Sequence, residues 1–362
     1  MSRPVEDALR AAVHDLAGQA RPAPDLAAAA LERGRRRRAR RRATVTGAAL
    51  VALAALALPF ALLRPDRPAE PAHPRPTPTP STVRLPTPGA DWQNRPLTLP
   101  GGWVVTGGVT NGFGYVLDRT RSRYAMAEGY AEVWPAPAGT VTAVRDDQRP
   151  GQLGLADTAT AKVRWQRIRG WTSLQWSPDG RRLAVTASRG GERYLGVLEV
   201  GGRYREYRVD RIRYFCTDFC AFTWTRDGRE VTLPLTDEFK PHDESKPRQA
   251  RWGVQFFSAD EGRPTRFVKI PGDPAGPWAW SPDGERVVVQ GQQEPLLVDA
   301  ATGTVLGTLP AADVAWVTDE RLLYRRPGGY RDVVLADTAG HELERLPLPR
   351  ELAERTVSVA PK

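Results

Sequence analysis

Cysteine and histidine are scarce in this chain, whose 362 residues include two cysteines and four histidines. The cysteines, Cys216 and Cys220, cannot close a tetrahedral zinc site without further ligands. His242 and Asp218 are the only near candidates along the sequence. We therefore expect no metal site.

Short catalytic motifs are also missing. The sequence contains no Gly-x-Ser-x-Gly, no phosphate-binding loop and no His-Glu-x-x-His. Its histidines are scattered over an N-terminal segment, a proline-rich stretch, a charged loop and a late turn: His14, His73, His242 and His341. We expect no catalytic residues, no cofactor and no enzymatic activity.

Acidic residues are outnumbered by basic ones, which gives a net charge of +10. The excess is concentrated at the N-terminus, because residues 1–43 hold eleven Arg against five Asp or Glu. Residues 64–362 carry 41 basic and 37 acidic side chains and are nearly balanced. Nucleic acid usually binds to a folded domain with a basic surface. We therefore expect no binding of nucleic acid. Arginines beside a membrane can instead contact anionic lipid head groups.

An uncharged run, Thr44–Leu63, is long enough to cross a bilayer as one helix. Eight arginines lie between Arg33 and Arg42 on its N-terminal side, and such clusters stay in the cytoplasm. We predict a single-pass protein of the cell membrane, with residues 1–43 cytoplasmic, residues 44–63 a signal anchor, and the rest extracytoplasmic. A cleaved signal peptide is the alternative, but the leader before the span is much longer than usual.

The cytoplasmic tail shows two helical patterns. One apolar face is formed by Val5, Leu9, Val13 and Leu16. Asp25 is a candidate N-cap of a second helix. Such short helices are marginal alone, so the tail is either poorly ordered or docks on a cytosolic partner. It loosely resembles the cytosolic arms of membrane anti-sigma factors, although it lacks their His-x-x-x-Cys-x-x-Cys motif.

Proline dominates the stretch after the predicted span. Nine prolines occur between Arg64 and Pro88, a composition typical of extended, semi-rigid polyproline spacers. We interpret residues 64–96 as a linker. Recognition by a proline-binding domain is an alternative.

Beyond the linker the sequence is repetitive. Aromatic-ended strands, followed by a tight turn and an apolar strand, begin at Leu174, Phe222, Trp278 and Val314. The first three turns share an Asp-Gly pair in which Asp caps the loop and Gly accepts positive φ: Asp179 and Gly180, Asp227 and Gly228, Asp283 and Gly284. The copy that begins at Val314 lacks this glycine. Each copy continues with two more strands, which predicts four-stranded units of the size of propeller blades.

These repeats resemble the TolB-type (WD-like) β-propeller repeat, an aromatic-Ser-Pro-Asp-Gly pattern between two strands. The strong matches are Trp176 to Leu183 and Trp280 to Val287, and two earlier units are phased more loosely. The resemblance implies an all-β domain over residues 97–362 with six four-stranded blades. It does not imply a reaction, because propellers host many functions.

Recurring residues of the repeats are better interpreted as structural than as functional. The turn aspartates occupy equivalent positions, which favours capping over a catalytic carboxylate ring. The repeated tryptophans are expected in the core between blades and not in sugar stacking: Trp176, Trp224, Trp280 and Trp316. Trp171, Trp252 and Trp278 are less constrained and could line a surface.

Two further features concern loops and ring closure. Because the domain is expected in an oxidising compartment, we predict a disulfide between Cys216 and Cys220. The charged insertion 236–249 is expected to be a solvated loop. The ring would close either through Leu97–Leu99 or through the alternating tail Thr356–Val359, and we favour the tail.

We interpret the protein as a non-catalytic binding or sensing module for an extracytoplasmic protein, a glycan or an envelope component. One alternative is a propeller-type glycan hydrolase or lyase. Another is a transmembrane regulator whose tail binds a partner such as a sigma factor. Two or three carboxylates converging at a funnel mouth would favour the hydrolase, and an apolar funnel would favour binding.

Overall fold

The computed structural model describes residues 82–110, 113–238, 240, 245–328 and 331–362. These residues all belong to one compact unit, Pro78–Lys362. The predicted cytoplasmic tail, membrane span and most of the predicted linker lie outside the described residues. Within the described part, no helix is long and apolar enough to cross a membrane.

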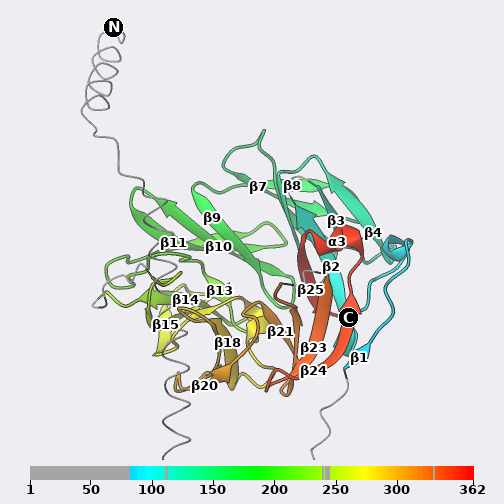
Figure 1. Cartoon of the computed structure of the whole chain (residues 1–362). Helices are drawn as coiled ribbons and strands as arrows, with labels where there is room; N and C mark the ends of the chain where they lie inside the picture. The colour runs from blue at the N-terminus through cyan, green and yellow to red at the C-terminus, as the bar shows by residue number, and fades with distance from the viewer. Residues whose placement is uncertain (1–81, 111–112, 239, 241–244, 329–330) are drawn as a thin grey trace, which may run out of the picture. The chain divides into compact units, whose positions relative to one another are not determined.

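Six antiparallel four-stranded sheets form a β-propeller (Figure 1). Blade 1 combines the C-terminal strand with β2 (Trp103–Thr110), β3 (Phe113–Asp118) and β4 (Arg123–Glu128). Blade 2 contains β5 (Glu132–Pro135), β6 (Val141–Arg145), β7 (Gln152–Asp157) and β8 (Val163–Arg167). Blade 3 contains β9 (Trp171–Trp176), β10 (Arg182–Arg189), β11 (Glu192–Glu199) and β12 (Tyr204–Val209).

The remaining blades follow the same order along the chain. Blade 4 contains β13 (Thr223–Trp224), β14 (Glu230–Thr236), β15 (Arg251–Ser258) and β16 (Pro264–Val268). Blade 5 contains β17 (Asp273–Pro274), the 3-10 turn η3 (Pro277–Ala279), β18 (Arg286–Gln290), β19 (Pro295–Asp299) and β20 (Val305–Thr308). Blade 6 contains β21 (Val314–Thr318), β22 (Arg321–Arg325), β23 (Asp332–Asp337) and β24 (Glu342–Pro347). The predicted all-β, six-bladed fold is confirmed.

The C-terminal strand β25 (Thr356–Pro361) closes the ring. It follows the short helix α3 (Arg350–Ala353) and pairs antiparallel with β2 at the edge of blade 1 (Figure 1). Closure by the tail is therefore confirmed. The alternative segment also contributes, because Thr98 forms an isolated bridge with Val104.

The described end of the predicted linker is part of the folded unit. β1 (Val83–Arg84) pairs in parallel with β24 and adds a fifth strand to blade 6. Trp92, within the 3-10 turn η1 (Trp92–Asn94), is 2% exposed and packs against Tyr115 and Tyr124. A second 3-10 turn, η2 (Pro100–Gly102), leads directly into β2.

The Asp-Gly turns are built from local hydrogen bonds. In the blade 3 turn, the Ser177 hydroxyl donates to Asp179 Oδ1, which also accepts the Arg181 backbone N–H at 3.1 Å. Gly180 has φ +67° and its Cβ position would lie 2.6 Å from the Ala138 carbonyl oxygen. Burial acts to raise the pKa of Asp179, but its hydrogen bonds outweigh this and hold the pKa below the ordinary value.

Three of the repeated tryptophans form a hydrogen bond from their own blade to the preceding one. The indole N–H groups of Trp176, Trp224 and Trp316 donate to the backbone carbonyls of Trp134, Gln175 and Ala279 at 2.8–2.9 Å. The guanidinium groups of the preceding blades cover two of these rings: Arg182 lies over Trp224, and Arg286 over Trp316. Among the described residues, the indole N–H of Trp280 has no partner.

Cys216 and Cys220 form the predicted disulfide, with their Cα atoms 5.8 Å apart. It lies in the loop between β12 and β13, which joins blades 3 and 4. Because the covalent loop is so short, we expect the Cys216→Ser, Cys220→Ser variant to lose less than about 3 kcal/mol in its free energy of unfolding. Thiol labelling of the unreduced, denatured protein checks the bond itself, and stoichiometric labelling at both positions would contradict it.

Candidate functional site

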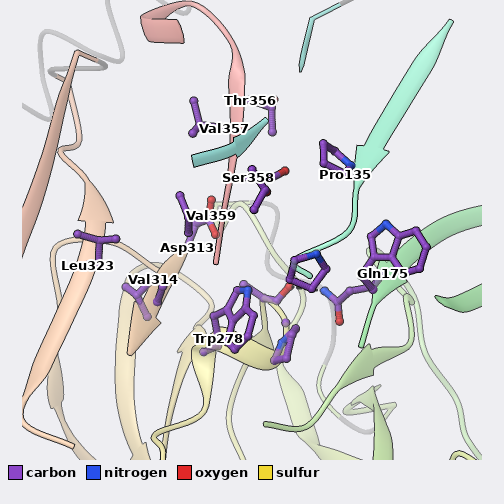
Figure 2. A pocket seen from close by; sticks show the side chains of 18 of the residues that line it. Pro135, Gln175, Trp278, Asp313, Val314, Leu323, Thr356, Val357, Ser358 and Val359 are labelled. Atoms are coloured by element: carbon purple, nitrogen blue, oxygen red, sulfur yellow. Dashed lines mark hydrogen bonds between the residues drawn. The ribbon is translucent and has the colours of Figure 1, made fainter. Parts of the chain in front are cut away.

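An axial cavity of about 360 Å³ is the candidate site. Edge strands of four blades, β25, β5, β9 and β21, line it together with η3 of blade 5. Figure 2 shows side chains from these separate elements facing a common space. The cavity also reaches between blades 6 and 1, since Leu323 of β22 and Val333 of β23 belong to its lining.

The walls of the axial cavity are mostly apolar. Three proline rings and several aliphatic and aromatic side chains supply them: Pro135, Pro137, Pro277, Leu174, Val357, Val359, Trp134 and Trp278. Trp278 is held in place by an edge-on contact with Trp103, at 5.1 Å between ring centroids, and by Arg226 over its face. The volume and lining are those of small-molecule pockets.

Gln175 joins three blades at this cavity. Its side-chain amide donates to the Ala275 carbonyl of blade 5 at 2.8 Å. Its side-chain oxygen accepts the Trp224 backbone N–H of blade 4 at 2.7 Å. Both polar ends of the side chain are therefore used within the protein, and Gln175 is a structural part of the wall.

Replacing Gln175 by Leu keeps the approximate size of the side chain and removes both hydrogen bonds. The partly buried Trp224 N–H would lose its partner, and an unsatisfied group of this kind costs roughly 1–3 kcal/mol. The Ala275 carbonyl is exposed, so water replaces its lost bond. We expect a lower free energy of unfolding by about that amount or more, measured by denaturant titration. A stability equal to that of the wild type would contradict this role.

Among the described residues, Asp313 is the only carboxylate in the lining of the axial cavity. It directly precedes β21, and its side chain is exposed to the cavity while protein atoms enclose it. This enclosure raises the pKa of Asp313 above the ordinary value, and Arg325 opposes the rise. Within the described part of the chain, Asp313 forms no hydrogen bond or salt bridge.

Arg325 of β22 is the other charged residue of the lining. Its guanidinium donates to the backbone carbonyls of Arg355 and Ala353, each at 2.6 Å. These bonds fix the segment that leads into the closing strand. Arg325 thus has a structural task at the edge of the cavity, whereas the carboxylate of Asp313 has none.

Apart from Trp176, which belongs to the lining of the cavity, the repeat residues singled out in the sequence lie elsewhere. None of the turn aspartates belongs to the lining of the cavity; Asp179 and its counterparts bond within their own turns. The four repeated tryptophans are buried, with at most 7% exposure. Of the less constrained tryptophans, Trp278 lines the cavity. Trp252 is 53% exposed, and its ring packs against that of Phe267.

A second cluster of polar residues lies where blades 4 and 5 meet the disulfide loop. Arg251 donates to the carbonyls of Thr217 and Asp218 and to the Thr236 hydroxyl. It also holds both carboxylate oxygens of Asp273, at 2.6 and 3.0 Å. With its side chain 2% exposed, Arg251 ties β15, β17 and the disulfide loop together.

Neither cluster has the composition of a metal centre. Within the described ranges, no group of three or more His, Cys, Asp or Glu could hold a metal ion. His242 lies outside the described residues, so the metal hypothesis around the cysteines is not tested at that position.

Sequence reasoning missed Asp313 and Gln175. Gln175 directly precedes a repeated tryptophan, but nothing in the repeat marks it. Asp313 lies three residues before Trp316, where the other copies have Ser173, Ala221 and Pro277. A charged residue at an otherwise uncharged repeat position is the signal that could have found it.

Comparisons with known proteins give structural likenesses only. No protein-family model and no curated protein matches the chain. TolB from Acinetobacter baumannii is similar at 17% identity and TM-score 0.48, over 72% of this chain and 66% of TolB. The dihydro-heme d1 dehydrogenase NirN is similar at 17% identity and TM-score 0.42, over 72% of this chain and 57% of NirN. The β-propeller domain of the Trilobed protease from Pyrococcus furiosus is similar at 16% identity and TM-score 0.43, over 70% of this chain and 83% of that domain.

Proposed function

We propose that this protein is a membrane-anchored, non-catalytic binding module whose ligand site is the axial cavity. The observation that supports this most is the lining of the cavity, in which apolar walls surround a single carboxylate. Apolar pockets with a few placed polar groups are the usual form of ligand sites. The ligand buries an apolar group there, and it belongs to an extracytoplasmic protein or to another component of the envelope.

A glycan hydrolase is less well supported by this lining. Most glycoside hydrolases use two carboxyl groups on opposite sides of the scissile bond. In the described part of the lining, Asp313 has no second carboxylate beside it. The aspartates that repeat around the ring are committed to their turns, where their hydrogen bonds are local.

Binding in the axial cavity is tested with a neutral apolar probe, 2-phenylethanol, and the full chain in detergent. Isothermal titration should show saturable binding to the wild type. Ser358 lies on β25 and faces the cavity (Figure 2), so Ser358→Phe should fill the space and abolish the signal. Ser358→Thr is the matched control and should bind the probe. Binding that survives Ser358→Phe, or no saturable binding at all, would overturn the proposed site.

The membrane topology is tested separately. The proposal places the arginine cluster before Thr44 in the cytoplasm and the propeller outside. Protease added to intact protoplasts should digest the propeller and spare residues 1–43. Release of a soluble fragment that begins near Arg64 would show a cleaved signal peptide instead.

A further inference from the structure

The unpartnered carboxylate in the axial cavity points to the charge of the ligand. Asp313 is exposed to the cavity but surrounded by protein atoms, so its carboxylate is less well hydrated than one on the outer surface and gains from an opposite charge or from hydrogen-bond donors. Asp313 lacks both kinds of direct partner among the described residues. The nearest cation, Arg325, lowers the pKa of Asp313 through space, but enclosure outweighs it.

Other polar groups of the lining do not supply the missing partner. Gln175 is bonded to blades 4 and 5 at both ends of its side chain. Arg325 is bonded to two backbone carbonyls. The strands β25, β5 and β9 contribute no charged side chain to the lining. The carboxylate therefore remains available to a molecule that enters the cavity.

We propose that the axial cavity binds a small organic ammonium ion, with its cationic group against Asp313 and its apolar body against the proline, valine and tryptophan walls. Such a ligand meets both features of the lining at once. The ammonium group would donate charge-assisted hydrogen bonds to the carboxylate. The apolar body would be removed from water by Leu174, Val357 and Trp278. This inference rests on the proposed function and specifies its ligand class.

A metal ion fits the same position less well. Calcium takes six to eight oxygen ligands and magnesium a near-octahedral set. The lining offers one carboxylate, and the described part of the chain contains no cluster of metal-binding side chains. An organic cation needs only one anionic partner, because its remaining surface is satisfied by apolar and aromatic contacts.

The test compares three probes of nearly equal size by isothermal titration: 2-phenylethylammonium, neutral 2-phenylethanol and anionic phenylacetate. The full chain should bind the ammonium ion at least about tenfold more tightly than the alcohol, as expected for a hydrogen-bonded charge pair. Asp313→Asn should remove this difference by weakening the binding of the ammonium ion. Asp91→Asn is the matched control, since Asp91 is exposed and lies outside the cavity lining.

The pH dependence supplies a measurement on the unaltered protein. Binding of 2-phenylethylammonium requires ionised Asp313. The affinity of the protein for this ion should therefore fall as the pH is lowered through the raised pKa of Asp313. The other titratable groups of the lining, Arg325 and Tyr324 of β22, do not titrate in the acid range. Asp313→Asn should bind the ion equally over that range.

The outcomes separate this inference from the proposed function. The ammonium ion and the alcohol could bind with equal affinity, and Ser358→Phe could abolish the binding of both. This result would overturn the charge preference and leave the cavity as the binding site. Tighter binding of phenylacetate would also overturn it and assign the selectivity to Arg325. Failure of all three probes to bind saturably would overturn both the ligand class and the proposed site.

Discussion

Deletion of residues 355–362 is expected to lower the melting temperature of the full chain by about 10 °C or more. The deletion removes β25, the edge strand of blade 1, and with it the antiparallel ladder from Trp103 to Val109. Ala360 is fully buried, and Val357 and Val359 pack on the adjacent core. We estimate a loss on the order of 5 kcal/mol for these contacts, which corresponds to roughly 10–20 °C in a domain of this size.

The control for this deletion removes only the exposed end of the chain. Pro361 and Lys362 are exposed, so a chain ending at Ala360 should melt close to the wild type. Differential scanning calorimetry or circular dichroism of both variants makes the comparison. If the chain without 355–362 melted like the wild type, the ring would not depend on this strand for closure.

Substitution of Arg251 by Met is expected to lower the free energy of unfolding by about 3–5 kcal/mol, the usual effect of removing one member of a buried ion pair. The side chain is 2% exposed and makes five hydrogen bonds, to Asp273, Thr236 and two carbonyls of the disulfide loop. Methionine retains much of the apolar stem, so the loss reports mainly on the charge and its bonds. Denaturant titration provides the measurement.

Two further variants isolate the pairing with Asp273. Arg248→Met removes the other guanidinium on this carboxylate, at 2.8 Å, but Arg248 is 27% exposed and should cost only about 1 kcal/mol. Adding Asp273→Asn to Arg251→Met should restore part of the lost stability, because no carboxylate then remains without its partner. Additive losses in the double variant would argue against the pairing.

The architecture could be predicted from the sequence because its signals are local. Pro-Asp-Gly turns such as Ser177–Gly180 determine their own conformation through hydrogen bonds within a few residues. The repeated tryptophans mark one position in successive blades. The closing strand could also be predicted from the sequence, since the alternation of Val357 and Val359 is typical of a half-buried strand.

Other elements carry no such local signal. β1 has two residues, too few to show any periodicity, and the residues of β24 that pair with it lie 261 positions further along the chain. The Arg251 cluster joins residues from three elements, so no spacing in the sequence predicts it. Pairing of this kind is decided by tertiary packing, which sequence patterns do not contain.

The lining of the axial cavity is another feature that sequence patterns do not predict. Its lining takes a few residues from each of five blades, and each of them is unremarkable in its own strand. Asp313 differs from its counterparts in the repeat, but the sequence does not tell whether that position faces the axis, a neighbouring blade or solvent. Only the closed ring brings Asp313, Trp278 and Ser358 to one space (Figure 2).

The most direct test of the axial cavity as the ligand site is methyl NMR of the full chain during titration with 2-phenylethylammonium. Leucine and valine methyl groups supply both the site and the control. Our account predicts shift changes at Leu174, Val314, Leu323 and Val357, which line the cavity. It predicts none at Val305 and Leu306, which are exposed on β20. Shifts confined to β20 or other outer strands, with the cavity methyl groups unchanged, would contradict it.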